Sequence, residues 1–204
     1  MSLELMKAGE RDIMAAGSWK DHVHELADLL KNLSFCGADG GEIGAEAGFT
    51  AWQTMTLRLR DKRGTIFLAG NGASASMASH MAADLAKNAR LHTEVFSDLS
   101  LITAISNDMG YEFVFSEPLS RRARAGDMLV AISSSGRFKN IVAAVRVAVE
   151  HGLDIVTLSA MDAANPLRHG GTLNVYVPAM TYGYAESCHA VILHYWMDLV
   201  EEGR

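Results

Sequence analysis

Two short loops rich in glycine and serine each follow an apolar segment and precede a helical one. The first reads Gly70-Asn71-Gly72-Ala73-Ser74 after residues 65–69, and the second reads Ser133-Ser134-Ser135-Gly136 after residues 128–132. The first turn of a helix has unpaired N–H groups and partial positive charge, so it favours an anion. Two such loops at the ends of parallel strands predict a site for a phosphorylated small molecule.

The two loops differ in how specific they are. The first lacks the spacing of G-x-G-x-x-G and the Gly-Lys-Ser/Thr of a Walker loop, so an ordinary strand-to-helix turn remains its alternative. Three consecutive serine hydroxyls are poor core residues. We expect them at the surface, where they cap the next helix and donate to phosphate oxygens.

Histidine and acidic residues share a helix face at three places: His80 with Asp84, Glu186 with His189, and His194 with Asp198. Each pair alone is typical of a solvated surface. Together, histidine and carboxylate groups from two helices could converge on a divalent metal such as zinc. Asn107-Asp108 forms either a turn or a set of hydrogen-bonding groups for substrate hydroxyls.

The elements that must position these residues alternate along the chain. We expect strands at 65–69, 93–96, 128–132, 154–158 and 173–177, and helices at 18–33, 51–61, 75–88, from 101, 113–124, 139–151 and 184–201. The glycine-rich segment 34–48 is expected to contain a loop. Unbroken apolar strands alternating with helices predict a parallel sheet covered on both faces. The ligand should lie beyond the carboxyl ends of the strands.

Composition narrows the class of protein. The chain has 204 residues and a net charge of −6, which argues against direct contact with nucleic acid. Only two cysteines are present, Cys36 and Cys188, as expected in a reducing compartment. We find no signal peptide and no apolar run of membrane-spanning length, so we expect a cytoplasmic protein without membrane contact.

Taken together, five features of the chain resemble the sugar isomerase (SIS) superfamily. They are the first loop, His80 with Asp84, Asn107-Asp108, the serine run, and Gly183-Tyr184-Ala185 before a histidine-bearing helix. Within this superfamily, the chain is similar to the phosphoheptose isomerases over residues 51 to 201. The resemblance implies a three-layer α/β/α sandwich of the flavodoxin-like type, with a five-stranded, mainly parallel sheet. It also implies a SIS domain over 51–204 and an N-terminal helical extension over 1–50 that serves oligomerisation.

The family's functional residues map onto this chain. Substrate binding would involve Asn71, Gly72, Ala73, Ser74, Asn107, Asp108, Ser133, Ser134, Ser135 and Glu186. One zinc ion per site would be held by His80, Asp84, Glu186 and His194, with Asp84 as base and His194 as acid. The implied reaction converts sedoheptulose 7-phosphate to D-glycero-D-manno-heptose 7-phosphate through an enediol(ate). The alternative is a non-catalytic SIS module that binds a replication initiator protein or senses a sugar phosphate.

Three positions depart from the family pattern. Asp84 stands for glutamate, Glu186 stands for glutamine, and Phe138 stands where the family has a later phosphate-binding serine. Arg137 and Lys139 could compensate electrostatically for that missing serine.

The resemblance also implies a homotetramer with sites near subunit boundaries. The segment from Ser18 to Leu33 supports this interpretation, because Leu26, Leu29, Leu30 and Leu33 offer more apolar surface than a helix outside an α/β core can bury alone.

Overall fold

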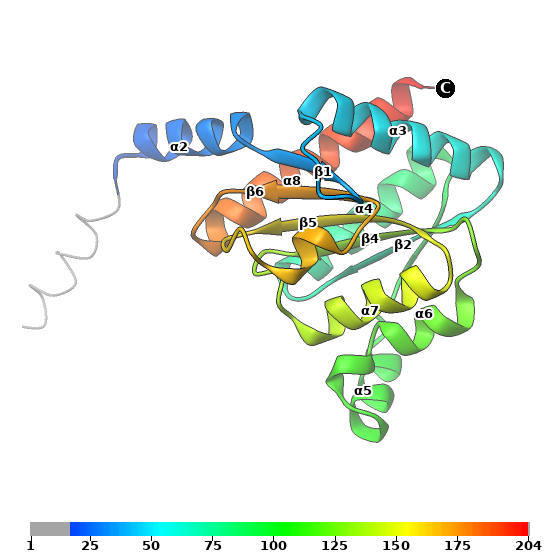
Figure 1. The fold of residues 1–204 in the computed structure, drawn as a ribbon. Helices are drawn as coiled ribbons and strands as arrows, with labels where there is room; N and C mark the ends of the chain where they lie inside the picture. Colours follow the sequence, from blue (N-terminus) through cyan, green and yellow to red (C-terminus); the bar gives the residue numbers. More distant parts are fainter. Residues whose placement is uncertain (1–16, 204) are drawn as a thin grey trace, which may run out of the picture.

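The computed structural model describes residues 17–203, which form a three-layer α/β/α sandwich (Figure 1). The central sheet has six strands in the order β1-β6-β5-β4-β2-β3. Its strands are β1 (Ser34–Gly37), β2 (Thr65–Gly70), β3 (His92–Val95), β4 (Met128–Ser133), β5 (Asp154–Ala160) and β6 (Leu173–Val177). All neighbouring strands are parallel except β1, which pairs antiparallel with β6.

The helices cover both faces of this sheet. Their bounds are α2 Trp19–Lys31, α3 Ala45–Asp61, α4 Ala73–Ala89, α5 Leu99–Asp108, α6 Ser116–Arg122, α7 Lys139–Glu150 and α8 Tyr182–Glu202, with short 3-10 helices η1 (Tyr111–Phe113) and η2 (Pro166–His169). Helices α3, α4 and α8 contribute to one apolar core, and α5, α6 and α7 to the other. None of the helices within residues 17–203 has both the length and the apolar character needed to cross a membrane.

Strand β2 explains why the sheet has two cores. Its side chains alternate between the faces, so that Ile66 and Leu68 belong to the first core while Phe67 and Ala69 belong to the second. All four are buried. The continuous apolar run in the sequence is therefore that of a strand covered on both sides.

The five parallel strands have the flavodoxin-like order, in which β2, the first of these five in the sequence, lies between β3 and β4. The switch point of such a sheet lies between β2 and β4, where chain connections leave in opposite directions. Both polar loops follow these two strands, at residues 70–74 and 133–136. The topology therefore brings both loops to the place where ligands bind in doubly wound sheets.

One expectation about the sheet is wrong: it has six strands rather than five. Residues 34–48 are not wholly a loop, because Phe35 and Cys36 are buried in β1. The glycines in this segment have a packing role as well, since a Cβ on Gly48 would lie 2.2 Å from the Phe35 ring. The expected domain boundary at 50/51 falls inside α3, so the sheet draws on residues assigned to the extension.

Helix α2 projects beyond the edge of the sheet (Figure 1). Ser18 caps its N-terminus in a capping box with Asp21. Leu29 is buried and Leu26, Leu30 and Leu33 pack against the core of the chain itself, so these leucines leave less apolar surface free than the sequence predicts. The large exposed apolar side chains of α2 are Trp19 and Val23. The remaining expectations for residues 1–16 lie outside the described part of the chain.

Candidate active site

The first loop needs glycine at two positions. A Cβ on Gly70 would lie 2.6 Å from the backbone of Ser74, so only glycine allows the helix to start this close to the strand. Gly72 has φ +56° and is the N-cap of α4, which has no side-chain cap. Ala73 begins the helix, and Ser74 is buried in its first turn. The N–H groups of Ser74 and Ala75 bond to the carbonyls of Asn71 and Gly72, so the uncapped end of α4 leaves the N–H of Ala73 for a ligand.

The second loop turns around Gly136, which has φ +63° and lies against Asn165. Ser133 and Ser134 are buried and Ser135 is half-buried, so the expectation of a fully surface-exposed serine run is wrong. The serines also do not cap α7. Its N-cap is Phe138, and no side chain caps this helix. The reason is that the serines turn within the loop, where the Ser133 hydroxyl accepts a hydrogen bond from Gly136 N at 3.2 Å.

Arg137 follows the second loop, but its guanidinium pairs with the Asp162 carboxylate. A hydrogen bond from the Ala164 N–H and then Arg137 itself lower the pKa of Asp162. The positive charge of Arg137 is therefore already partly compensated. Lys139, at the start of α7, has no such ion pair among the described residues.

An amide pair that the sequence did not reveal joins the two loops. Asn71 in the first loop and Asn140 in α7 exchange two hydrogen bonds, at 3.0 and 2.9 Å. The hydroxyl of Tyr111 donates to Oδ1 of Asn71 at 3.0 Å. Asn140 is buried, although it lies in the first turn of an otherwise apolar helix face. A buried amide needs a partner, and this lone asparagine is the signal that could have found the pair.

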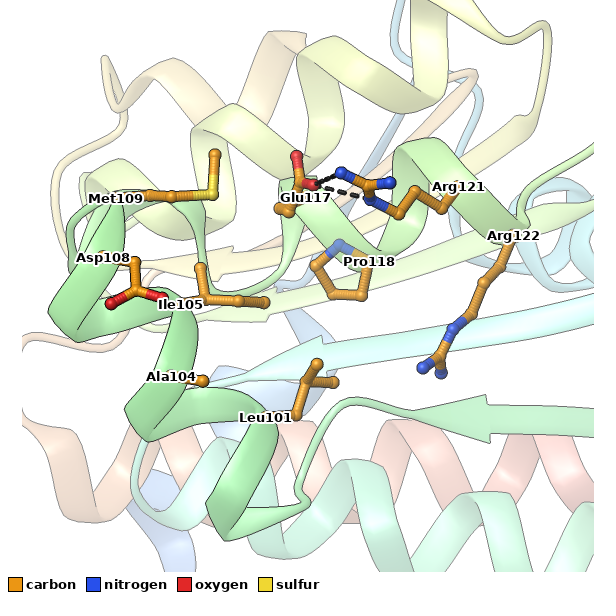
Figure 2. A pocket seen from close by; sticks show the side chains of 9 residues that line it. All are labelled: Leu101, Ala104, Ile105, Asp108, Met109, Glu117, Pro118, Arg121 and Arg122. Atoms are coloured by element: carbon orange, nitrogen blue, oxygen red, sulfur yellow. Dashed lines mark hydrogen bonds and ion pairs between the residues drawn. The ribbon is translucent and has the colours of Figure 1, made fainter.

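Asn107 and Asp108 end α5. Nδ2 of Asn107 donates to Oδ1 of Asp108 at 2.8 Å, and within residues 17–203 no hydrogen bond joins either residue to the two loops. Asp108 lines a small, mostly apolar hollow between α5 and α6, with Met109 and Ile105 beside it (Figure 2). The segment nevertheless reaches the first loop through Tyr111.

Helices α4 and α8 bring His80, Asp84 and His194 together. The Nε2 atoms of His80 and His194 lie 3.3 Å apart, and Nε2 of His80 lies 3.3 Å from Oδ2 of Asp84. One possible ligand atom from each residue falls within 4.8 Å of the others. The first turn of α4 also belongs to the first polar loop, so one helix carries both features. This group could hold a metal ion.

The orientation of His194 is fixed by its own helix. Its Nδ1 lies 2.8 Å from the carbonyl oxygen of Ala190. A carbonyl can only accept, so Nδ1 carries the proton and donates. Nε2 of the neutral ring then has a free lone pair directed at His80. A hydrogen bond of this kind is typical of metal-binding histidines.

Two other residues of α8, Glu186 and His189, lie outside this group. Glu186 is eight residues before His194, about 12 Å along the helix axis, and does not belong to the three-residue cluster of the described chain. His189 is fully buried and its Nε2 lies 3.3 Å from the Ser159 carbonyl oxygen. Burial lowers the pKa of His189 to about 4, so the ring is neutral at pH 7.

Comparison with known proteins agrees with this arrangement. A family model described as SIS domain matches residues 49–160, more than half of the chain. This chain belongs to the SIS domain family. The match begins in α3 and ends with β5, so it includes both polar loops and the His80–Asp84 pair but not His194.

Individual relatives of this SIS protein extend the match. A phosphoheptose isomerase from Salmonella typhimurium is 28% identical over 194 residues, which cover 90% of this chain and 95% of the relative. The solved structure of the phosphoheptose isomerase GmhA from Neisseria gonorrhoeae is 30% identical with a TM-score of 0.70, and covers 76% of this chain and 86% of that one. The Vibrio vulnificus NanR protein complexed with ManNAc-6P has the same fold, at 18% identity and a TM-score of 0.62, over 96% of this chain and 67% of that one.

Proposed function

We propose that this SIS protein is an aldose–ketose isomerase that converts sedoheptulose 7-phosphate to D-glycero-D-manno-heptose 7-phosphate. The observation that carries this proposal is the convergence of His80, Asp84 and His194 within 4.8 Å on α4 and α8. The same helix α4 begins at the first anion-binding loop. The phosphoheptose isomerases similar to this chain support the same substrate.

The phosphate of the sugar would bind between the two loops. Neither helix α4 nor helix α7 is capped by its N-cap side chain, and among the described residues the first-turn N–H groups without a hydrogen bond are those of Ala73, Lys139 and Asn140, which are available to an anion. The hydroxyls of Ser74, Ser134 and Ser135 would add donors. We keep Asn71, Gly72, Ala73, Asn107, Asp108, Ser133 and Glu186 as the further substrate contacts that the resemblance implies.

The reaction moves one proton from C1 of the ketose to C2. A base takes the C1 proton, and the electron pair forms an enediol(ate) whose O2 receives a proton; C2 then receives a proton while the O1–H proton leaves and C1 becomes the aldehyde carbon. Asp84 is the base in this proposal. Its Oδ2 lies near His80, and no contact of Oδ1 with other described groups occupies that second oxygen.

The donor set fits zinc. Two donor atoms on a tetrahedral zinc ion lie about 3.3–3.4 Å apart, since Zn–N and Zn–O bonds are near 2.0–2.2 Å. The N···N and N···O separations of the cluster are both 3.3 Å. We therefore propose that His80, Asp84 and His194 would hold zinc; Glu186, the fourth ligand implied by the resemblance, lies outside this cluster and would come from another subunit of the proposed tetramer. When bound, the ion supplies Lewis-acid stabilisation of the enediolate oxygens.

His194 cannot be a zinc ligand and an acid at once. Its Nδ1 proton is held by Ala190, so Nε2 would serve both roles. A zinc-bound site makes His194 a ligand and leaves the proton transfers to Asp84, which would hold the ion through Oδ2 and transfer the proton through Oδ1. A metal-free site makes protonated Nε2 the acid. The zinc content of active protein distinguishes the two arrangements.

A second candidate is a non-catalytic SIS module. The shorter carboxylate at Asp84 favours a module that senses a sugar phosphate, and NanR is an example of the same fold with a bound sugar phosphate. A module that binds a replication initiator protein is the other form of this alternative. The clustered histidines favour the enzyme, because a sensor needs only the phosphate loops.

Steady-state kinetics with sedoheptulose 7-phosphate test the proposal. We expect turnover by the chain, its loss in Asp84→Asn and its retention in Asp84→Glu, which restores the family's residue. Tight binding of the sugar phosphate without turnover would favour the sensor instead.

We further propose a cytoplasmic homotetramer in which residues 1–50 mediate assembly and 51–204 carry the site. Exposed Trp19 and Val23 on α2 support an interface on this helix, and the two free, buried cysteines suit a reducing compartment. Deletion of residues 1–33 should dissociate the tetramer and lower activity. A fully active monomer in light scattering would overturn this assembly.

A further inference from the structure

A polar hollow lies at the amino ends of β2 and β4, the opposite ends of these strands from the polar loops. It has a volume of about 420 Å³ and is formed by the residues just before β2 and β4. Because these parallel strands lead away from it to the loops, the hollow is roughly 20 Å from the candidate active site, the length of a six-residue strand. Its charged lining residues are Lys62, Arg63, Arg122, Arg124, Glu94 and Asp127.

The acidic groups of this hollow are already satisfied. Glu94 pairs with Arg122. The buried carboxylate of Asp127 accepts hydrogen bonds from the backbone N–H groups of Thr65 and Arg124, both at 2.8 Å. Asp127 thereby ties together the two segments that carry the cations.

Three cations of the hollow have no acidic partner. The side chains of Lys62, Arg63 and Arg124 are exposed, and within residues 17–203 none of them forms an ion pair or hydrogen bond. They come from two separate segments that converge on one hollow in a chain of net charge −6. A concentration of unpaired positive charge on an acidic protein needs an explanation.

Helix ends explain only part of this charge. Lys62 and Arg122 lie at the C-terminal ends of α3 and α6, where the helix dipole favours cations. Arg63 is different, because it has φ +56° in the left-handed region. Its N–H bonds to the Arg60 carbonyl and the next N–H to that of Leu59, the pattern of a Schellman cap. Glycine is the preferred residue at this position, so arginine stands there at a conformational cost.

We propose that this hollow is a binding site for a small molecule that carries a diphosphate group. Two linked phosphates carry roughly three negative charges at pH 7 and could contact all three unpaired cations. The charged lining residues are four cations and two carboxylates, so the hollow has a net positive charge. The hollow has the size of a typical small-ligand site. Such a ligand would bind independently of the sugar phosphate, at the other end of the same strands.

Calorimetric titration of the full chain with pyrophosphate tests this site. The double variant Arg63→Gly/Arg124→Gln should bind about tenfold more weakly or worse, because each near-surface charge pair changes affinity several-fold. The same variant should unfold at an equal or higher temperature than the parent, since glycine relieves the backbone at position 63. A purely structural role for these arginines would lower the unfolding temperature instead.

Matched controls locate the anion. Arg90→Gly also replaces an exposed arginine with φ +56° at a helix end, but outside the hollow, and should leave pyrophosphate affinity unchanged. Ser134→Ala should leave it unchanged as well. Loss of affinity in either control would overturn the proposal, because the anion would then bind by general charge or at the serine loop.

Two further ligands define the chemistry. If the natural ligand is a nucleotide, ADP should bind at the same site as pyrophosphate. If the free diphosphate is recognised, ADP should fail to bind. In either case, the double variant should lose affinity for each ligand that the parent chain binds. Inorganic phosphate binding as tightly as pyrophosphate would contradict the diphosphate assignment. So would a parent chain that binds no pyrophosphate below about 10 mM.

Discussion

Asn71 and Asn140 bind each other through two amide hydrogen bonds, one in each direction, of 3.0 and 2.9 Å. Asn71 belongs to the loop after β2, and Asn140 to the helix that follows the serine loop after β4. The pair therefore sets the separation of the two segments between which we propose that the phosphate binds. It is the one direct side-chain link between the first polar loop and α7 that the described residues provide.

Replacing Asn140 with alanine should both destabilise the chain and weaken substrate binding. The change removes two hydrogen bonds to Asn71 and a third, in which Oδ1 accepts from Ile141 N. We expect the free energy of unfolding to fall by about 1–3 kcal/mol and KM to rise more than kcat falls. Tyr111→Phe, which removes a single hydrogen bond at an exposed residue, is the matched control with a smaller effect. An unchanged KM in Asn140→Ala would contradict a positioning role.

The Ser134 hydroxyl should matter for binding rather than for folding. Ser134→Ala is expected to lower sugar-phosphate affinity by roughly 1 kcal/mol, about fivefold, through loss of a charge-assisted hydrogen bond. Ser133→Ala provides the comparison, because its hydroxyl accepts from Gly136 N and so also stabilises the turn. Calorimetry and urea unfolding measure the two effects. Unchanged affinity in Ser134→Ala and Ser135→Ala together would exclude the serine run from the phosphate site.

Zinc content can be measured without substrate. The purified chain should bind about one zinc ion per site, and a chelator that removes it should lower the unfolding temperature along with activity. His194→Ala should lose the ion, whereas His169→Ala, a change of an exposed histidine outside the cluster, should keep it. Full activity in metal-free protein would exclude the zinc role and leave His194 as the acid.

His189 makes stability depend on pH. Burial lowers its pKa to about 4, so the unfolded chain, with a histidine pKa near 6.5, binds more protons than the folded chain between these values. Stability from this residue is complete above pH 6.5 and falls as the pH drops toward 4. We expect the chain to lose on the order of 2 kcal/mol at pH 5 relative to pH 7.5 from this group. Urea unfolding of His189→Gln at both values should lack that loss, and an equal pH dependence in parent and variant would contradict it.

The sequence predicted the parallel strands well and the edge of the sheet poorly. The apolar segments near 65–69 and 128–132 are each covered on both faces, so their burial is visible as unbroken hydrophobicity. Strand β1 has four residues and lies in a glycine-rich segment, and its support comes from pairing with β6, packing of Phe35 and hydrogen bonds to the turn that follows it, such as Phe35 N to Glu42. Such tertiary support leaves no periodic signal.

The residue types of the candidate site were predictable from the sequence, but the contacts between residues on different elements were not. His80 and Asp84 share a face of one helix, which spacing alone gives. Their approach to His194, over a hundred positions later in the chain, depends on how α4 and α8 pack against each other. The sequence also did not predict the Asn71–Asn140 pair, because a single asparagine at a helix start resembles an ordinary polar residue.

The most direct test of the central proposal is incubation of the chain with sedoheptulose 7-phosphate in D₂O, followed by NMR of the product. We expect D-glycero-D-manno-heptose 7-phosphate with solvent deuterium at C2, because the proton passes through Asp84 and exchanges before it returns to carbon. Asp84→Asn should give neither product nor label. An absence of product from the unaltered chain, or a product without deuterium at C2, would contradict isomerisation through Asp84.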